Sequence, residues 1–202
     1  MQPEIEVKFL DCDHGEIRKK LAAVGAQCTQ PRRLMRRAII DYPDRRLEKA
    51  DESGWGWIRV RDEGDKITCT YKHVGADERR TTHEIEFAIS DFDQAIKFFQ
   101  TIGLEVLSTQ ETKRETWQLG TVQVMLDEWP WIPPYIEIEG ETEAEIRNLA
   151  EALGMDWKTA VHGSSDAAYR LYFPKMSEQD GVSDISELTF AGEMPMYLKE
   201  RQ

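Results

Sequence analysis

The sequence predicts an α+β protein in which eight antiparallel strands close into a barrel and helices pack outside it. Three observations support this fold. Strand-like segments alternate charged and apolar residues, capped helix-like segments occur between them, and the charges keep to one face from the first strand to the last. A β-sandwich core would need that face to be apolar, whereas a barrel with a polar lumen satisfies both faces.

The first strand, residues 4–10, shows the alternation most clearly. Glu4, Glu6 and Lys8 share one face, and apolar residues occupy the positions between them. Because a strand rises about 3.3 Å per residue, the two carboxylate stems start about 7 Å apart. That spacing is close enough for the carboxylates to hold hard divalent cations beside a polyanion.

The same pattern recurs along the chain. Segments 84–87 and 135–139 alternate glutamate with apolar residues, and segments 58–61 and 68–72 alternate basic or polar residues with apolar ones. A solvent-facing strand also alternates in this way, so one such strand is not specific. The recurrence in five strands favours a shared charged interior.

The first half of the chain is predicted to contain five strands, counting the first, and two helices. Asp13 is predicted to cap a helix that continues to about Val24, and Gly25 is predicted to end it. Residues 27–42 are extended and carry four arginines, and the turn at 41–44 breaks this strand. The four arginines are Arg32, Arg33, Arg36 and Arg37.

Two further strands, 55–61 and 67–74, are predicted to form a hairpin across the turn at 62–65, and a strand at 81–89 follows. Asp91 then caps a predicted helix over 92–102. The spacing of its apolar residues predicts burial of Ala95, Phe98, Phe99 and Ile102.

The second half of the chain completes the set of strands. Strands are predicted at about 105–118, 121–128 and 134–139, and helices at 143–153 and 165–172. Thr142 and Glu145 form a capping box at the start of the first of these helices. Residues 1–175 therefore form the predicted domain, and residues 176–202 form an acidic tail. We expect this tail to be peripheral, although its sparse apolar residues could dock on the barrel or on a partner subunit in a homodimer.

Composition limits the function. The chain has 202 residues, with 26 Lys and Arg against 38 Asp and Glu, and its net charge of -12 opposes general nucleic-acid binding. The cysteines Cys12, Cys28 and Cys69 lack the spacing of a zinc site or a disulfide framework. No segment approaches the length of an apolar membrane span, so we expect a cytoplasmic protein without membrane contact.

The charged residues occur in the order of a known family. The sequence resembles the CYTH superfamily, the triphosphate tunnel metalloenzymes, which include class IV adenylate cyclases, thiamine triphosphatases and tripolyphosphatases. The resemblance covers about residues 2–173. It rests on Glu4-x-Glu6-x-Lys8, Arg59-x-Arg61, Lys72, Glu84-x-Glu86, Arg114, Asp127 and Glu137-x-Glu139.

The resemblance implies a barrel whose lumen binds a triphosphate with Mg²⁺ or Mn²⁺. The expected phosphate-binding residues are Lys8, Arg37, Arg59, Arg61, Lys72, Lys113 and Arg114, of which Lys8, Arg59 and Lys72 are the expected catalytic residues. The expected metal ligands are Glu4, Glu6, Glu84, Glu86, Asp127, Glu137 and Glu139. Glu84, Glu86 and Asp127 could instead orient the basic side chains.

Two positions depart from the hydrolytic relatives. Those proteins carry an Asp-x-Tyr on the second strand before another Asp, and the Tyr pairs with the first-strand lysine to activate water. The corresponding positions here are Arg37, Ile39 and Asp41, so the Tyr is absent and Lys8 or a metal-bound water would have to act as the base. On the sixth strand, Thr112 replaces a common lysine.

The leading hypothesis is a metal-dependent triphosphatase that hydrolyses inorganic triphosphate or a nucleoside triphosphate. A class IV adenylate cyclase is the first alternative, although the His-Phe pair usual before the first-strand motif is absent from Met1-Gln2-Pro3. A polyphosphate or nucleotide binder that has lost turnover is the second. Trp55, Trp57, Trp129 and Trp131 could stack a base, or they could be core or rim residues.

Overall fold

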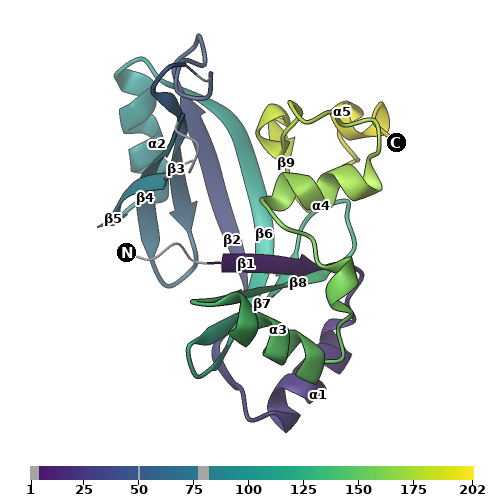
Figure 1. The fold of residues 1–202 in the computed structure, drawn as a ribbon. Helices are drawn as coiled ribbons and strands as arrows, with labels where there is room; N and C mark the ends of the chain where they lie inside the picture. Colours follow the sequence, from purple (N-terminus) through teal and green to yellow (C-terminus); the bar gives the residue numbers. More distant parts are fainter. Residues whose placement is uncertain (1–4, 50, 77–81) are drawn as a thin grey trace. The chain divides into compact units, whose positions relative to one another are not determined.

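The computed structural model describes residues 5–49, 51–76 and 82–202. Glu4, one of the predicted metal ligands, lies outside the described residues, as does the segment Met1-Gln2-Pro3. The architecture is α+β, as predicted (Figure 1). The strands are β1 Ile5–Phe9, β2 Gln27–Asp41, β3 Gly54–Asp62, β4 Ile67–Gly75, β5 Thr82–Ile89, β6 Glu105–Leu119, β7 Val122–Glu128, β8 Tyr135–Gly140 and β9 Glu187–Leu188.

The helices are α1 His14–Ala23, α2 Phe92–Thr101, α3 Glu143–Ala152, α4 Ser165–Tyr172 and α5 Met196–Lys199, with short 3₁₀ turns η1 Trp157–Thr159 and η2 Val182–Asp184. Helices α1, α2 and α3 begin at the predicted caps, and α5 is a short helix that the sequence did not predict. The side chains of Asp13, Asp91 and Thr142 each accept hydrogen bonds from backbone N–H groups of the first helical turn. No helix among the described residues is long and apolar enough to cross a bilayer.

The strands form one sheet in the order β1-β8-β7-β6-β2-β3-β4-β5, and β9 adds to β6. The sheet is antiparallel apart from β9, which runs parallel to β6. Among the described residues, β1 pairs with β8 and β5 pairs with β4, and no ladder of hydrogen bonds joins β1 to β5. Closure into an eight-stranded barrel is therefore not confirmed.

The chain divides into two compact units, each built from separate segments. The first contains residues 1–33, 112–181 and 190–202, and the second contains residues 34–111 and 182–189. The tail thus contributes to both units.

The first unit has an apolar core on one face of β1, β7 and β8. Val7 and Phe9 of β1 pack there with Ile17 of α1 and Ile146 of α3. Both helices lie on the same side of β1 and β8 (Figure 1). The predicted alternation in the first strand is confirmed, because these apolar side chains leave the opposite face to Glu6 and Lys8.

The second unit has a smaller core between its strands and α2. Ala38, Val60 and Cys69 come from three neighbouring strands, and Phe92 comes from the first turn of α2. The opposite face of these strands carries the predicted phosphate-binding residues.

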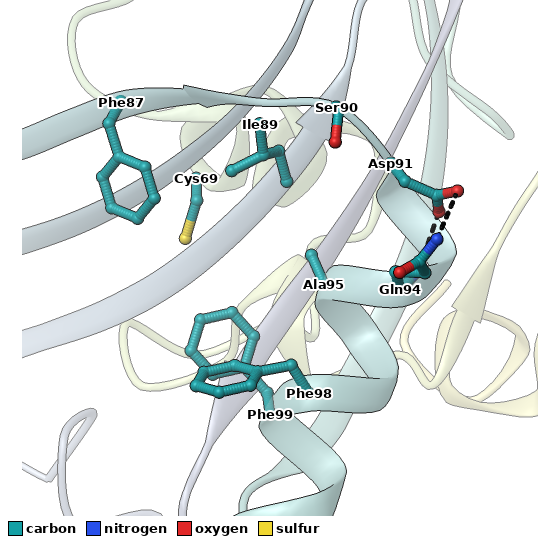
Figure 2. Close-up of a pocket in the computed structure, with 9 residues that line it drawn as sticks. All are labelled: Cys69, Phe87, Ile89, Ser90, Asp91, Gln94, Ala95, Phe98 and Phe99. Carbon is teal, nitrogen blue, oxygen red and sulfur yellow. Dashed lines mark hydrogen bonds between the residues drawn. The ribbon is translucent and has the colours of Figure 1, made fainter.

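The prediction that Phe98 and Ile102 are buried is wrong. They are 59% and 55% exposed, because the stripe of α2 that packs against the sheet runs through Phe92, Ala95 and Phe99. Positions 98 and 102 lie to one side of that stripe at 100° per residue. Phe98 instead borders an apolar groove of about 300 Å³ against β4 and β5 (Figure 2).

Part of the tail packs into the second unit. Val182, Ile185 and Leu188 are buried, and the Ser108 hydroxyl donates a hydrogen bond to the Ile185 carbonyl at 2.6 Å. Residues 187–188 form β9, a strand that the sequence analysis did not predict. Two residues are too few to show an alternation.

Candidate functional site

The charged face of the first unit is centred on Lys8. Its side chain is 2% exposed, and its ammonium lies 3.0 Å from a Glu6 oxygen and 3.1 Å from a Glu137 oxygen. It also donates a hydrogen bond of 2.6 Å to the Gly163 carbonyl. Lys8 pairs with Glu137 across β1 and β8, and Glu6 pairs with Glu139, so strand register gathers these charges.

Lys8 is held in its charged form. Burial lowers its pKa, but the neighbouring Glu137 and Glu6 carboxylates outweigh burial, and the pKa is raised above 10.5. An ammonium that keeps its proton can contact a phosphate oxygen but cannot accept a proton from water. This environment argues against Lys8 as the general base.

Arg114 extends the same face onto β6. Its Nε and Nη2 donate to the two oxygens of Asp127 at 2.7 and 2.6 Å, and Nη2 lies 3.6 Å from Glu137. Burial lowers the pKa of Arg114, but Asp127 and Glu137 raise it by more. Because Asp127 is 1% exposed and holds Arg114 in a two-point contact, it fixes the orientation of an arginine that the sequence predicts to bind phosphate.

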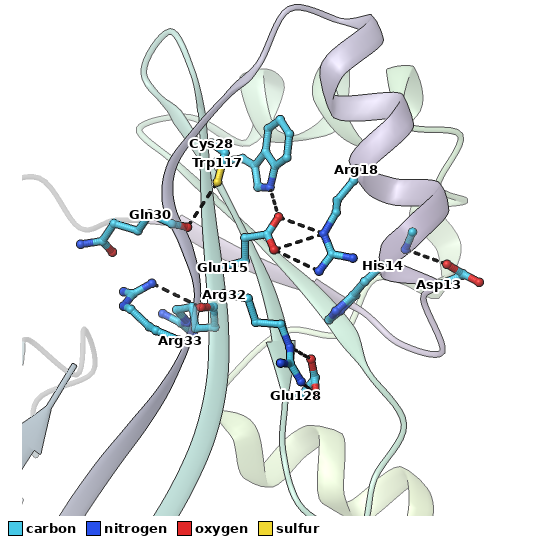
Figure 3. A network of polar contacts seen from close by, with 12 residues as sticks. Asp13, His14, Arg18, Cys28, Gln30, Arg32, Arg33, Glu115, Trp117 and Glu128 are labelled. Carbon is cyan, nitrogen blue, oxygen red and sulfur yellow. Dashed lines mark hydrogen bonds and ion pairs between the residues drawn. The ribbon is translucent and has the colours of Figure 1, made fainter. Parts of the chain in front are cut away.

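Lys113 does not join this face. It is adjacent to Arg114 in β6 and therefore points to the other side of the strand, where its ammonium lies 3.9 Å from the centre of the Phe190 ring. The same outer side carries an ion pair from Arg18 of α1 to Glu115 and a hydrogen bond from Trp117 to Glu115 (Figure 3).

The charged face of the second unit contains two adjacent arginines on β3. Arg59 and Arg61 pair with Ile39 and Arg37 of β2, so strand register places three guanidinium-bearing positions together. Nη2 of Arg61 lies 2.6 Å from a Glu63 oxygen, whereas Nη2 of Arg59 is 3.9 Å from Glu86.

Of the two arginines on β3, Arg59 lies in the environment that is less favourable for a positive charge. Burial, together with the charge of Arg61, lowers its pKa to about 10, and its Nε is buried without a hydrogen-bond partner. The guanidinium remains charged at neutral pH. A buried cation with an unsatisfied donor beside a second cation is suited to an anion that would supply the missing acceptor and charge.

Lys72 and the two glutamates of β5 complete this face. The ammonium of Lys72 lies 3.1 Å from Glu84, its partner across β4 and β5. Partial desolvation raises the pKa of Glu86. The hydrogen bond that the Thr70 hydroxyl donates to Glu86 at 2.7 Å, together with the charges of Arg61 and Arg59, outweighs it, so the pKa is lowered. In this structure both glutamates contact basic or hydroxyl side chains, which is the orienting role that the sequence allowed for them.

The structure also describes the surroundings of Ile39 and Asp41, the second-strand positions discussed for the hydrolytic relatives. Ile39 pairs with Arg59, so no proton acceptor stands at that position. Asp41 is 1% exposed and accepts hydrogen bonds from the backbone N–H groups of Tyr42, Leu47 and Glu48. Its carboxylate therefore fixes the connection after β2.

The carboxylates on the charged face of the first unit are of the chemical type that binds hard divalent cations. Glu6, Glu137 and Glu139 offer only carboxylate oxygens, the ligands that Mg²⁺ and Mn²⁺ prefer. In the part of the chain that the structure describes, no group of three or more His, Cys, Asp or Glu side chains is gathered closely enough to hold a metal ion. Glu6 and Glu137 contact Lys8 instead.

Two groups on these faces, the Glu63 carboxylate and the Gly163 carbonyl, have no role that the sequence predicts. Glu63, 6% exposed, contacts Arg61, although its place in a turn between strands suggested a solvated residue. The Gly163 carbonyl reaches Lys8 because residue 161 forms a bridge with Lys8. The periodicity of the sequence contains no signal for a contact across 155 positions.

Comparisons with known proteins agree with the resemblance. Residues 2–167 match the CYTH domain. The chain therefore belongs to the CYTH domain family. A search among curated proteins found no significant match.

Solved structures share the fold at low sequence identity. A candidate adenylate cyclase from Vibrio parahaemolyticus superposes with a TM-score of 0.67 at 17% identity, covering 81% of this chain and 95% of that one. A conserved hypothetical protein from Pyrococcus furiosus gives 0.60 at 20% identity, with 78% and 94% covered. A candidate adenylyl cyclase from Hippeastrum, described as having a dominant triphosphatase activity, gives 0.54 at 14% identity, with 88% and 98% covered.

Proposed function

We propose that this protein is a metal-dependent enzyme that acts on a triphosphate, with hydrolysis of the terminal phosphoanhydride as its reaction. The observation that carries the proposal is the largely buried pair Arg59 and Arg61, with side chains 16% and 18% exposed, which lies on a strand face with Lys72. Membership of the CYTH domain family supports the triphosphate as the anion. The Hippeastrum neighbour, described as having triphosphatase activity, agrees with the reaction.

The basic residues bind and orient the phosphates. Arg59, Arg61 and Lys72 are the phosphate-binding residues on the second unit, and Lys8 and Arg114 are the basic residues on the charged face of the first unit. Asp127 and Glu84 hold Arg114 and Lys72 in place through the ion pairs described above. The closed barrel expected from the family is part of this proposal, and an experimental structure with a bound phosphate tests it.

Carboxylates hold the metal. Glu6, Glu137 and Glu139 are the proposed ligands among the described residues, and Glu4 is a candidate from the sequence alone. A bound Mg²⁺ or Mn²⁺ neutralises phosphate charge and polarises the phosphoryl group that is attacked. With a metal on these carboxylates, the Lys8 ammonium that now contacts Glu6 and Glu137 would be available to bind a phosphate oxygen.

The adenylate cyclase alternative draws on one observation of this chain. Ile39 occupies the position of the water-activating Tyr, and a cyclase has no need to activate water. In that reaction the 3'-hydroxyl of ATP attacks the α-phosphorus, the α–β phosphoanhydride breaks, and pyrophosphate leaves. The Vibrio neighbour, described as a candidate adenylate cyclase, agrees with this alternative. The same absence would also suit a binder without turnover.

One experiment separates the three functions. Purified protein is incubated with tripolyphosphate and, separately, with ATP, each with Mg²⁺ or Mn²⁺, and phosphate, pyrophosphate and cyclic AMP are resolved. Release of phosphate supports the triphosphatase, and equal amounts of cyclic AMP and pyrophosphate identify a cyclase instead. Binding of either ligand without any product identifies a binder and contradicts the enzyme proposal.

A further inference from the structure

Two tryptophans continue the line of arginines on β3. Trp55, Trp57, Arg59 and Arg61 occupy alternate positions, and the register with β4 is continuous along the whole of β3. Without a bulge, all four side chains project from the same face of the strand. Lys72 pairs with Trp57, so the aromatic residues directly adjoin the phosphate-binding cations.

The two rings form one aromatic surface. Their centroids are 5.1 Å apart with 26° between the ring planes, and Trp55 is 40% exposed. The apolar core beneath the opposite face of β3 contains Val60 and Ile58 but neither tryptophan. The pair therefore does not belong to the core that holds this strand.

A line of two aromatic rings and two guanidinium groups is suited to a ligand that carries both a flat ring and phosphate groups. Indole faces stack on flat heteroaromatic rings whatever their substituents, because every such ring has a π-face. Positions two apart on a strand are about 7 Å apart, so a ring stacked at Trp57 and a phosphate bound at Arg59 are separated by about 7 Å along the strand. Arg59 also has the buried Nε without a partner.

We propose that the substrate is an organic triphosphate with a heteroaromatic ring, such as a nucleoside triphosphate, rather than inorganic triphosphate. The ring stacks on the Trp55–Trp57 surface, and the phosphates extend along β3 toward Arg61. This inference rests on the triphosphate-binding function proposed above and narrows its substrate class.

The test uses two non-hydrolysable ligands that differ in the nucleoside. Binding of β,γ-imido-ATP and of imidotriphosphate is measured by calorimetry for the wild type, Trp55→Ala and Trp57→Ala. We expect the wild type to favour the nucleotide, and each alanine variant to lose about tenfold in nucleotide affinity while its affinity for imidotriphosphate is unchanged. Phe98→Ala, which removes an exposed aromatic ring from the other face of the same unit, should change neither affinity.

Trp55→Phe and Trp57→Phe each keep an aromatic ring, so they should retain most of the nucleotide preference. They are the controls for alanine variants that lose affinity because they do not fold. Alanine variants that lose both ligands equally, or neither, would overturn the inference and leave the triphosphate function intact. A wild type that favours imidotriphosphate would do the same. A wild type that binds neither ligand would overturn the proposed function itself.

Discussion

At the level of single residues, basic and acidic side chains are proposed to have different roles, phosphate binding and metal binding. Arg61 and Lys72 carry positive charge on the second unit, and Glu6 and Glu139 carry negative charge on β1 and β8 of the first. If the first pair contacts phosphate and the second holds metal, substitutions at the two sets must fail differently.

Replacing Arg61 by Ala should weaken tripolyphosphate binding about ten- to a hundredfold, because it removes a charge-assisted contact of about 1.5–3 kcal/mol. The concentration of Mn²⁺ that gives half-maximal activity should not change. Glu139→Gln should instead raise that concentration, because an amide is a poorer ligand for a hard cation. Steady-state kinetics over a metal titration measures both effects.

Arg36→Ala is the matched control for the arginine. Arg36 neighbours Arg37 on β2 but projects from the opposite face, where it pairs with Asp62 and its guanidinium lies over the Phe92 ring, so its loss should leave substrate affinity unchanged. Identical metal titrations for Arg61→Ala and Glu139→Gln would contradict the division of roles.

Ile39 offers a gain-of-function test, because it stands opposite Arg59 at the position that the resemblance assigns to the Tyr of the hydrolytic relatives. If the protein is a hydrolase without that residue, Ile39→Tyr should raise the rate of phosphate release from tripolyphosphate. Ile39→Phe adds the ring without the hydroxyl and should not. An unchanged or lower rate in the Tyr variant, or an equal gain in the Phe variant, would count against the missing-base argument.

At the scale of the elements, Glu115 ties α1 to β6. The carboxylate is 7% exposed and accepts hydrogen bonds from Arg18 of α1 and from Trp117 of the same strand. Burial raises the pKa of Glu115, but these two hydrogen bonds outweigh burial, and the pKa is lowered below 4.5. A carboxyl group whose pKa is lower in the folded state stabilises the fold above its unfolded pKa, and this contribution is lost as the pH falls through the folded pKa.

Glu115→Gln should therefore lower the free energy of unfolding by about 1–3 kcal/mol at pH 7. The difference from the wild type should stay constant down to about pH 5 and shrink below the ordinary carboxyl pKa of about 4.3. Urea unfolding at several pH values measures it. Glu143→Gln, in an exposed ion pair with Arg147, should have almost no effect at any pH. A pH-independent difference for Glu115→Gln would show that charge is not its cause.

At the scale of the whole molecule, the tail contributes packing. Leu188 of β9 is fully buried, and its neighbour Glu187 is exposed. We expect Leu188→Ala to lower the free energy of unfolding by about 2–5 kcal/mol, and Glu187→Ala to lower it by far less. Thermal unfolding of the two variants measures the contrast.

The tail contributes none of the proposed phosphate or metal contacts. At a temperature where Leu188→Ala is fully folded, its affinity for imidotriphosphate should therefore equal that of the wild type. A large loss of affinity in the folded variant would contradict the peripheral role proposed for residues 176–202.

The sequence by itself determined the family, the strands β1 to β8, the capped helices and the face on which most of the predicted site residues lie, Lys113 being an exception. These features depend on local periodicity and on capping side chains, which act within a few residues. Asp13, Asp91 and Thr142 start helices in the structure as the sequence predicts. The first-strand alternation likewise places Lys8 on the charged face.

Only the tertiary structure decided which partners the charges have. In the structure Lys8 contacts the Gly163 carbonyl, Arg114 contacts the Asp127 carboxylate, and Arg61 contacts the Glu63 carboxylate. The tertiary structure also placed Lys113 against Phe190, left Phe98 exposed and added β9 to the sheet. The physical reason is that most of these contacts join residues far apart in the chain, and that strand register and the direction of a helix stripe set them. Residue type and local spacing do not encode such contacts.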